Sequence, residues 1–375
     1  MTRRMLFSAA GGHGHLQPLL PLAEQAARAG HEVLVTAAAS LAGHVTSRGL
    51  AFAPTGPDLK PIHAPLVVHS LDKERRVVAD YFAARLGHAR ATAVLDLCRA
   101  WRPDVVVHDE VDFGASVAAE AAGLPHVSVI VIGAGRFILP ELVEVPLARL
   151  SSDFDVDPRG GAELRHGQLT LTPFPASFRH PGDRLPGTVV GYHLEAPPRG
   201  TVRQDGVAAF VTLGTIFNTE SGDLLRTAAL GAAACPEVER VIVATGEHLD
   251  PAVLGQLPRH VAVHQFVNQD AVLSECDVVV SHAGSGTVLG ALSQALPTVN
   301  LPMGADQQLN ADRLKALGLG MTLIADEADV DQVRDAVAAV LTSAAIAQKL
   351  DAVCTEIFAL PGIEGAIRAV SDLVA

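Results

Sequence analysis

Residues 281–287 have the sequence Ser281-His282-Ala283-Gly284-Ser285-Gly286-Thr287. They follow an apolar run, Cys276-Asp277-Val278-Val279-Val280, which predicts a buried parallel strand, and they precede a helical pattern over 288–295. A glycine-rich turn from a strand into a helix lets backbone N–H groups approach a phosphate, and the N-terminus of the helix favours negative charge there. His282 adds a side-chain donor. We therefore predict a phosphate site in this turn.

A second polar stretch follows further along the chain, with the sequence Gly304-Ala305-Asp306-Gln307-Gln308-Leu309-Asn310. It places a carboxylate and two amides at the start of another predicted helix, a polarity that suits sugar hydroxyls. Asp306 could instead be a helix N-cap, a role that Asp fills well. Together the two stretches predict a site for a sugar attached to a diphosphate.

The length and the order of predicted elements indicate two domains. The chain has 375 residues and 49% hydrophobic residues, and strands alternate with helices along most of it. This alternation is typical of doubly wound parallel sheets in an α/β fold. Two prolines and a glycine in 195–200 mark the best linker. We expect a first domain over 1–195, a linker over 196–206, a second domain over 207–360, and a last amphipathic helix within 361–375.

The predicted elements are as follows. In the first half we expect strands over 4–8, 32–36, 51–53, 104–108 and 126–132, and helices over 16–29, 71–100, 113–122 and 140–150. In the second half we expect strands over 208–213, 240–245, 261–264, 277–280 and 298–301, and helices over 288–295 and 363–374.

Charge and composition exclude several classes of protein. The formal net charge is −13, which argues against nucleic acid as a partner, because such partners require a dense basic face. No apolar run approaches the length of a membrane-spanning helix, and the apolar segment after Arg4 is too short for a signal sequence, so we expect a cytoplasmic protein without a membrane partner. The cysteines, which lack metal-ligand spacing, are predicted to be reduced: Cys98, Cys235, Cys276 and Cys354.

The first glycine-bearing turn, Gly12-His13-Gly14-His15-Leu16-Gln17, invites a dinucleotide-binding interpretation. Gln17 stands where the third glycine of that fingerprint belongs, and no acidic residue ends the second strand, so we reject it. A histidine here can act as a general base, best with a carboxylate to orient it. Asp109 closes the fourth strand, whose carboxyl end shares a rim with that of the first strand. His15 and Asp109 could therefore meet, or each could be an ordinary loop residue or helix cap.

These residues resemble a family. The chain is similar over essentially its whole length to two-domain GT-B glycosyltransferases that use nucleotide sugars, above all the actinobacterial enzymes that glycosylate antibiotics and other natural products. The resemblance rests on Gly14-His15-Leu16-Gln17-Pro18, Arg28-Ala29-Gly30-His31-Glu32-Val33, Arg102-Pro103-Asp104-Val105-Val106-Val107-His108-Asp109, Thr212-Leu213-Gly214-Thr215, Gln265-Phe266-Val267-Asn268-Gln269, residues 281–287 and Asp306-Gln307-Gln308-Leu309-Asn310. The order and spacing of these motifs make it specific.

The resemblance implies roles in the first domain. The catalytic base maps to His15, which Pro18 follows, and His13 is its rival. The carboxylate that orients the base maps to Asp109, with Asp112 as a nearby alternative. We interpret His31 and His108 as structural.

The resemblance also implies roles in the second domain. His282 would donate to the diphosphate, together with backbone and hydroxyl donors from Gly284, Ser285, Gly286 and Thr287. Gly214 and Thr215 would lie near the diphosphate, and the Val267 backbone would meet the base. Asp306 and Gln307 would hold sugar hydroxyls. The last helix would pack back on the first domain. No cofactor and no metal held by the protein is implied.

The function that we predict is transfer of a sugar, a deoxysugar in particular, from TDP or UDP to an apolar secondary-metabolite aglycone, with inversion. Residues 54–68, 71–86 and 132–145 are the expected acceptor walls. The partners are small-molecule donor and acceptor, and a homodimer is one candidate assembly. Four alternatives remain: an epimerase of UDP-N-acetylglucosamine with the GT-B fold, a lipid-directed sugar transferase, a non-catalytic activator of a partner transferase, and a nicotinamide oxidoreductase.

Overall fold

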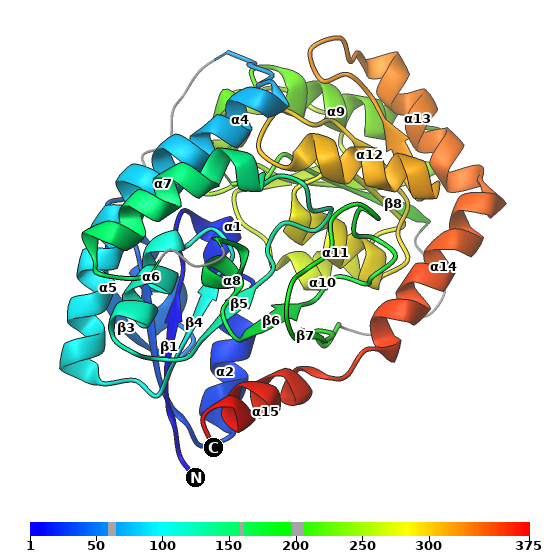
Figure 1. Cartoon of the computed structure of the whole chain (residues 1–375). Helices are drawn as coiled ribbons and strands as arrows, with labels where there is room; N and C mark the ends of the chain where they lie inside the picture. The colour runs from blue at the N-terminus through cyan, green and yellow to red at the C-terminus, as the bar shows by residue number, and fades with distance from the viewer. Residues whose placement is uncertain (59–64, 158–160, 197–205, 216) are drawn as a thin grey trace.

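Two parallel β-sheets organise the chain (Figure 1). The computed structural model describes residues 1–58, 65–157, 161–196, 206–215 and 217–375. The first sheet has the order β3-β2-β1-β4-β5-β6-β7 and the second the order β10-β9-β8-β11-β12-β13. The strands of the first sheet are β1 (Arg4–Ser8), β2 (Glu32–Ala37), β3 (Ala51–Pro54), β4 (Val105–Asp109), β5 (His126–Val129), β6 (Leu169–Thr172) and β7 (Val189–Gly191). Those of the second are β8 (Val207–Thr212), β9 (Val238–Ala244), β10 (Val261–His264), β11 (Val278–Ser281), β12 (Thr298–Asn300) and β13 (Gly320–Thr322).

Helices cover both faces of each sheet. Those that belong to the first half are α1 (His13–Leu16), α2 (Leu20–Arg28), η1 (Ala39–Leu41), α3 (Ala42–Thr46), α4 (Leu71–Val77), the π-helical η2 (Val78–Leu86), α5 (Gly87–Trp101), α6 (Phe113–Ala121), α7 (Pro140–Asp153) and α8 (Gly161–His166). The second half has η3 (Phe217–Glu220), α9 (Leu224–Ala234), η4 (Pro251–Leu254), α10 (Gln269–Leu273), α11 (Ser285–Ser293), α12 (Gln307–Leu317), α13 (Val330–Thr342), α14 (Ala344–Ala359) and α15 (Ile363–Leu373).

The central strands are apolar without alternation because both faces of each sheet are covered. Every residue of β4 is buried, and so is every residue of β11. Each sheet also has a point at which the strand order reverses, between β1 and β4 in the first and between β8 and β11 in the second. In open α/β sheets, ligands bind outside the carboxyl ends of the strands at such points. The fold therefore offers two facing positions for a site.

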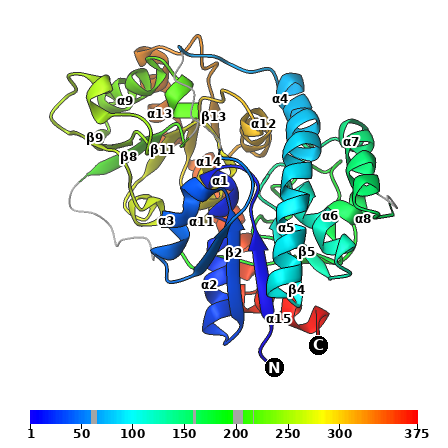
Figure 2. The same cartoon turned by 90° about the vertical axis from the view of Figure 1, so that its left-hand side faces the viewer.

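The two sheets lie in separate halves of the molecule that face each other through their loops. In Figure 2 the first sheet lies in the lower part, the second in the upper part, and α1 between them. Two hydrogen bonds join the loop after β5 to the second half: the Gly133 N–H donates to Ser285 Oγ at 2.8 Å, and the Ala134 N–H donates to Asn310 Oδ1 at 3.0 Å. The carboxyl ends of the two sheets thus meet.

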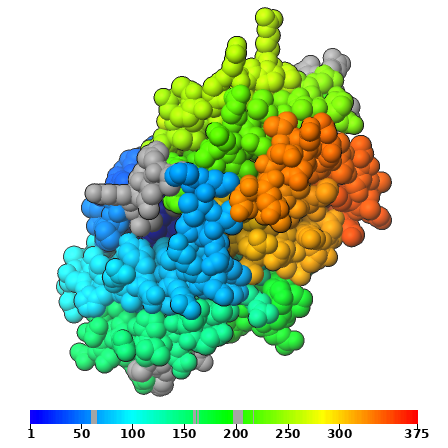
Figure 3. Space-filling view, turned by 90° about the horizontal axis from the view of Figure 1, so that it is seen from above, coloured from blue at the N-terminus to red at the C-terminus, as the bar shows by residue number. Residues whose placement is uncertain are grey.

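A segment before and within α4 lies across the boundary between the halves (Figure 3). The His69 N–H donates to the Met303 carbonyl at 2.7 Å, and Glu74 Oε2 accepts from the Ala305 N–H at 3.2 Å. Leu66 packs against the core of the second half. This part of the first half is therefore held on the loop that precedes α12.

The last helix returns to the first half. α15 contacts α2 (Figure 1), and its apolar face is buried in the core of the first sheet through Ile363, Ala366, Ile367 and Val370. The segment before α15 passes next to the residues that follow β7, where the His193 N–H donates to the Pro361 carbonyl at 2.9 Å. Residues 197–205 of the predicted linker lie outside the described residues.

Several expected boundaries were wrong. The helix predicted over 16–29 begins only at Leu20, after the separate α1, because Pro18 has no N–H to continue α1 and Pro21 is tolerated only in the first turn of α2. The strand predicted over 126–132 ends at Val129, because Glu110 Oε1 takes the N–H groups of Val131 and Ile132, at 2.8 and 2.7 Å.

Other elements were longer than predicted or were missed. Helix α11 begins at Ser285 rather than at 288, with Gly284 as its extended N-cap. α7 continues to Asp153. The short strands β6, β7 and β13 were not predicted at all.

Two further findings concern the hydropathy of the helices and the state of the cysteines. Within the described residues no single helix has the length and hydropathy to cross a bilayer; α13 and α14 meet that criterion only as a pair, which is bent by 68°. Within the described residues no disulfide joins Cys98, Cys235, Cys276 or Cys354.

Candidate active site

His15 and Asp109 meet at the point where β1 and β4 adjoin. His15 lies on α1, directly after the loop that leaves β1, and Asp109 is the last residue of β4. His15 Nδ1 lies 3.6 Å from Asp109 Oδ1. The His15 side chain is 25% exposed, whereas the Asp109 carboxylate is fully buried. The pair thus has one solvent-facing imidazole backed by a buried carboxylate, the polarity of a base and its orienting group.

Backbone donors fix the carboxylate, and a glycine makes room for the imidazole. Asp109 Oδ2 accepts from the Ala10 N–H at 2.7 Å, and Oδ1 accepts from the Val111 N–H at 2.8 Å. Gly11 has a φ of +106°, and a Cβ there would lie 2.6 Å from His15 Cδ2. A side chain at residue 11 would therefore displace the imidazole. The ring of Phe82 lies beside it, with centroids 5.7 Å apart.

The electrostatics of the pair favour a basic imidazole. Burial opposes protonation of His15, but the Asp109 carboxylate, with Asp306 and Glu110 further away, raises its pKa above the ordinary value. Burial also raises the pKa of Asp109, and its contact with His15 and the backbone N–H groups acts against that rise.

His13, the rival base, points elsewhere. Its ring contacts His44, with centroids 4.7 Å apart, and Phe266 of the second half, at 6.2 Å. Burial, followed by the neighbouring His44, lowers the pKa of His13 to about 4. Among the two histidines of this turn, His15 is the one beside Asp109.

Asp112, the alternative carboxylate, is occupied by Arg90. Arg90 Nε donates to Oδ1 at 2.9 Å and Nη2 to Oδ2 at 2.7 Å, and both side chains are buried. Ser8 Oγ donates to Asp112 Oδ2 at 2.8 Å, and the Ala115 N–H donates to Oδ1 as an N-cap contact. Asp112 therefore supports the loop beneath the His15–Asp109 pair.

His282 lies between two glycines at the point where β8 and β11 adjoin. A Cβ at Gly214, whose φ is +81°, would lie 2.6 Å from His282 Nε2, and one at Gly284 would lie 2.4 Å from the same atom. His282 Nδ1 is buried without a hydrogen-bond partner in the described residues. Burial lowers the pKa of His282 to about 4, so the ring is neutral near pH 7. Thr215, partly buried, follows Gly214 in the same loop.

The first turn of α11 offers main-chain donors. Gly284, at the N-cap, supplies no side-chain hydrogen bond, so the first N–H groups of the helix lack intrahelical acceptors. The hydroxyls of this turn are engaged. Ser285 Oγ donates to Asp306 Oδ2 at 2.6 Å, and Thr287 Oγ1 donates to Gln269 Oε1 at 3.1 Å. The N–H groups of Ser285, Gly286 and Thr287, rather than the two hydroxyls, are therefore the donors that the turn presents.

Asp306 stands at the N-cap position of α12 but makes no capping hydrogen bond. Its Oδ2 accepts from Ser285 Oγ and from Asn310 Nδ2, the latter at 2.8 Å, and burial raises its pKa. Gln307 Oε1 accepts from the N–H groups of Met303 and Gly304, at 2.8 and 3.1 Å. The oxygen of Gln307 thus shapes the loop.

The Val267 loop lies next to β10 on the same side. Val267 is partly buried and packs on the core beneath the second sheet. The preceding Phe266 is 58% exposed and faces His13 and His44 across the boundary. The sequence alone does not show that the Phe266 side chain is exposed at this boundary.

Only some side chains of the segments expected to form the acceptor walls are exposed on the surface. In segment 132–145, the side chains of Ile132, Phe137, Ile138 and Val143 belong to the core of the first sheet. The exposed large apolar side chains of the described parts of the predicted walls are Val67, Val68, Val77 and Val145. Residues 59–64 of the predicted wall 54–68 lie outside the described residues.

Three contributing residues had no predicted role. Asn310 donates through Nδ2 to the Ala283 carbonyl and to Ser285 and Asp306. It thus connects the loop before α11 to the loop before α12. Glu110 shapes the loop after β5, and Arg90 holds Asp112. Asn310 belongs to the polar stretch 304–310, but no role was predicted for it. His31 and His108 make structural contacts, His31 with the Arg3 N–H and His108 with the Asp109 carbonyl. The described residues include no cluster of three or more side chains suited to a metal ion.

Comparisons with known proteins identify the family of the chain. The N-terminal domain of the erythromycin biosynthesis protein CIII-like family matches residues 25–193, and its C-terminal domain matches residues 229–372. The 10-deoxymethynolide desosaminyltransferase of Streptomyces venezuelae is 28% identical over 99% of this chain and 97% of its own.

Solved structures share the fold. CalG4, the calicheamicin glycosyltransferase, superposes with a TM-score of 0.80 at 26% identity, over 99% of this chain and 98% of its own. SsfS6 of Streptomyces sp. SF2575, solved with thymidine diphosphate, superposes with a TM-score of 0.77 at 24% identity, over 99% of each chain. The chain therefore belongs to the erythromycin biosynthesis protein CIII-like family and is a glycosyltransferase with the GT-B fold.

Proposed function

We propose that this glycosyltransferase moves a deoxysugar from a nucleoside diphosphate, TDP in preference to UDP, to a hydroxyl of an apolar secondary-metabolite acceptor, with inversion. The observation that carries the proposal is the His15–Asp109 pair, whose Nδ1 and Oδ1 are 3.6 Å apart, on the rim that faces the His282 loop. Hydrogen bonds of catalytic pairs are often long without substrate and tighten in the complex.

The second half would hold the donor. The neutral His282 ring and the N–H groups at the start of α11 can donate to the diphosphate, and the helix N-terminus favours its charge. These donors are fixed before reaction, so they can stabilise the charge that develops on the leaving diphosphate. Asp306 would accept from sugar hydroxyls, because only its Oδ2 is committed to Ser285 and Asn310 among the described residues.

The first half would supply the base. His15 Nδ1 faces Asp109, so Nε2 takes the proton of the acceptor hydroxyl as its oxygen attacks the anomeric carbon. The bond from that carbon to the diphosphate oxygen breaks, and the nucleoside diphosphate leaves with the electron pair. Attack from the face opposite the leaving group inverts the anomeric centre. Asp109 stabilises the imidazolium that forms.

Donor and acceptor classes follow from the relatives and from the surface. The desosaminyltransferase relative is named for a deoxysugar, another relative is a TDP-daunosamine transferase, and SsfS6 was solved with thymidine diphosphate. The exposed Val67, Val68 and Val77 offer apolar surface for the acceptor near α4. The reaction requires no cofactor beyond the nucleotide sugar.

Calorimetric titration of TDP, UDP and NAD into the protein tests the donor class. We expect TDP to bind, UDP to bind no more tightly, and NAD to give no heat. Incubation of a TDP-deoxysugar with a panel of phenolic acceptors should then yield glycosides, whose anomeric configuration NMR reports. Binding of NAD alone, or a product with retained configuration, would contradict the proposal.

A further inference from the structure

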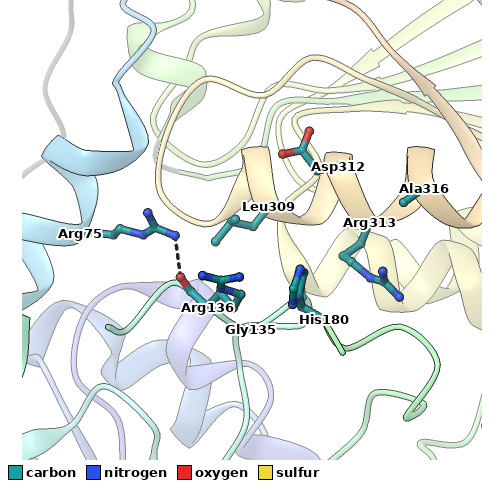
Figure 4. A pocket seen from close by; sticks show the side chains of 9 residues that line it. Arg75, Gly135, Arg136, His180, Leu309, Asp312, Arg313 and Ala316 are labelled. Carbon is teal, nitrogen blue, oxygen red and sulfur yellow. Dashed lines mark hydrogen bonds between the residues drawn. The ribbon is translucent and has the colours of Figure 1, made fainter. Parts of the chain in front are cut away.

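A cavity of about 310 Å³ lies between the two halves, and its lining includes neither the His15–Asp109 pair nor the His282 loop among the described residues. α4, the loop after β5 and the loop around residue 180 form its first-half side, and α12 forms the other (Figure 4). Its lining residues are Arg75, Ala134, Gly135, Arg136, His180, Leu309, Asp312, Arg313 and Ala316.

The lining is basic, although the chain as a whole carries a net charge of −13. Three arginines and one histidine line it, against one carboxylate, Asp312, which accepts from Gln308 Nε2 at 2.9 Å. Arg136 and Arg313 form no ion pair with a carboxylate in the part of the chain that the structure describes. The positive charges of the lining therefore outnumber its one carboxylate.

Backbone carbonyls orient two of these arginines. Arg313 donates through Nε to the Phe178 carbonyl at 2.9 Å and through Nη2 to the Ser177 carbonyl at 2.8 Å. Arg75 Nη2 donates to the Arg136 carbonyl at 2.8 Å (Figure 4), and Arg75 Nη1 lies 3.6 Å from the exposed carboxylate of Asp72, while Arg75 Nε is buried without a partner in the described residues. Carbonyls orient a guanidinium without neutralising it, and an exposed ion pair such as Arg75–Asp72 is screened by solvent.

The backbone that carries Arg136 is strained. Gly135 and Arg136 both have left-handed backbone, with φ of +73° and +57°, a conformation that costs a non-glycine residue about 1–2 kcal/mol. Two hydrogen bonds hold Arg136 there: its N–H donates to Asp183 Oδ2 at 2.7 Å, and its carbonyl accepts from Arg75. Strain that the surroundings maintain in this way is typical of ligand sites.

His180 adds a donor. Its Nδ1 accepts from the Gly182 N–H at 3.0 Å, so the proton of the neutral ring is on Nε2. A Cβ built at Gly182 would lie 3.2 Å from His180 Nδ1 and 3.9 Å from Arg136 Nη1, which places these two side chains together.

We propose that this cavity binds an oxyanion, a carboxylate or phosphate group, through Arg75, Arg136, Arg313 and the His180 Nε2–H. Because the residues come from both halves of the chain, the anion bridges them. The exposed Val77, which we propose as part of the acceptor surface, also lies on α4. The oxyanion is therefore either an acidic group of the acceptor, a source that rests on the proposed function, or a free anion from solution.

The first arm of the test uses inorganic phosphate. The protein is saturated with TDP, whose own binding heat is recorded, and phosphate is then titrated by calorimetry. We expect Arg136→Gln to weaken phosphate binding roughly tenfold, the loss of one hydrogen bond to a charged group. Arg76→Gln, an exposed charge on α4 that does not line the cavity, is the matched control and should bind phosphate as the unmodified protein does.

The second arm distinguishes the sources. Turnover is compared for 2-naphthol and 6-hydroxy-2-naphthoic acid, two acceptors that differ by one carboxylate. An acceptor-borne oxyanion predicts a lower KM for the acid, lost in Arg136→Gln and kept in Arg76→Gln. A free-anion site predicts phosphate binding without that KM difference.

Two results overturn the proposal, and neither is confused with failure of the donor site. If TDP binds but phosphate and the acid are both indifferent to Arg136→Gln, with unfolding midpoints unchanged, the cavity is not an oxyanion site. Absence of TDP binding in the unmodified protein would contradict the proposed function instead. Arg75→Gln, which removes the guanidinium with the buried Nε, provides a second variant should Arg136→Gln unfold.

Discussion

The imidazole of His15 and the carboxylate of Asp109 lie 3.6 Å apart, Nδ1 to Oδ1, although they come from different strand-to-helix connections. β1 and β4 are neighbours in the sheet, with Ser8 paired to His108, so the residues that follow them emerge side by side. The contact brings a partly exposed base against a buried negative charge. Substitution of His15 should therefore remove the base, and substitution of Asp109 should change its pKa.

Replacement of His15 by alanine should lower kcat by at least about 100-fold, the lower range for general-base assistance, without weakening TDP binding. His13→Ala is the matched control, because His13 faces His44 and Phe266 rather than Asp109. Single-turnover kinetics together with TDP calorimetry measure both quantities. Equal loss in the two variants would remove His15 from the role of base.

Asp109→Asn should lower kcat at least about tenfold and shift the pH profile. Asp109 raises the pKa of His15, and the base acts only when neutral, so kcat/KM of the unmodified enzyme falls as the pH drops through that raised pKa. Removal of the charge lowers the pKa of His15, so the acidic limb should move to lower pH. A limb that stays in place or moves upward would show that another group titrates.

Gly214→Ala should weaken donor binding. A Cβ at residue 214 would lie 2.6 Å from His282 Nε2 and would displace the ring. We expect an increase in the TDP dissociation constant of roughly tenfold, the loss of one hydrogen bond to a charged group. Gly49→Ala carries the same left-handed strain, at φ of +74° against +81°, with nothing within 4 Å. If both substitutions leave TDP affinity unchanged, His282 does not hold the diphosphate.

Arg90→Ala should destabilise the fold by about 3–5 kcal/mol, because it leaves the buried Asp112 carboxylate without its partner. Arg48→Ala breaks a partly exposed pair with Glu24 and should cost less than about 1 kcal/mol. Urea unfolding followed by circular dichroism gives both free energies. Similar small losses would mean that Arg90 contributes little to the support beneath Asp109.

The features that depend on strand order could be predicted from the sequence. Apolar runs such as Val105–Val107 and Val278–Val280 indicated buried parallel strands, and the residue after a strand lies on a known rim of the sheet. That indicated that His15 and Asp109 could meet, and the family resemblance favoured this pairing. The short strands β6, β7 and β13 escaped prediction, because three or four residues carry too little pattern to separate a strand from a loop.

The features that depend on long-range side-chain contacts could not be predicted. Nothing in the sequence around Arg90 indicates that its guanidinium lies on Asp112, the alternative carboxylate. In the same way, Ser285 was expected to offer its hydroxyl to a phosphate, but that hydroxyl donates to Asp306. Such partners are decided by how α5, α6, α11 and α12 pack in three dimensions.

The account depends most on the position of the diphosphate relative to His15, and a crystal structure with TDP bound tests it directly. We predict that the diphosphate accepts hydrogen bonds from His282 and from the N–H groups of Ser285, Gly286 and Thr287, and that His15 Nε2 faces the space beside Asp306. A diphosphate held elsewhere, with residues 282–287 free of it, would contradict the account.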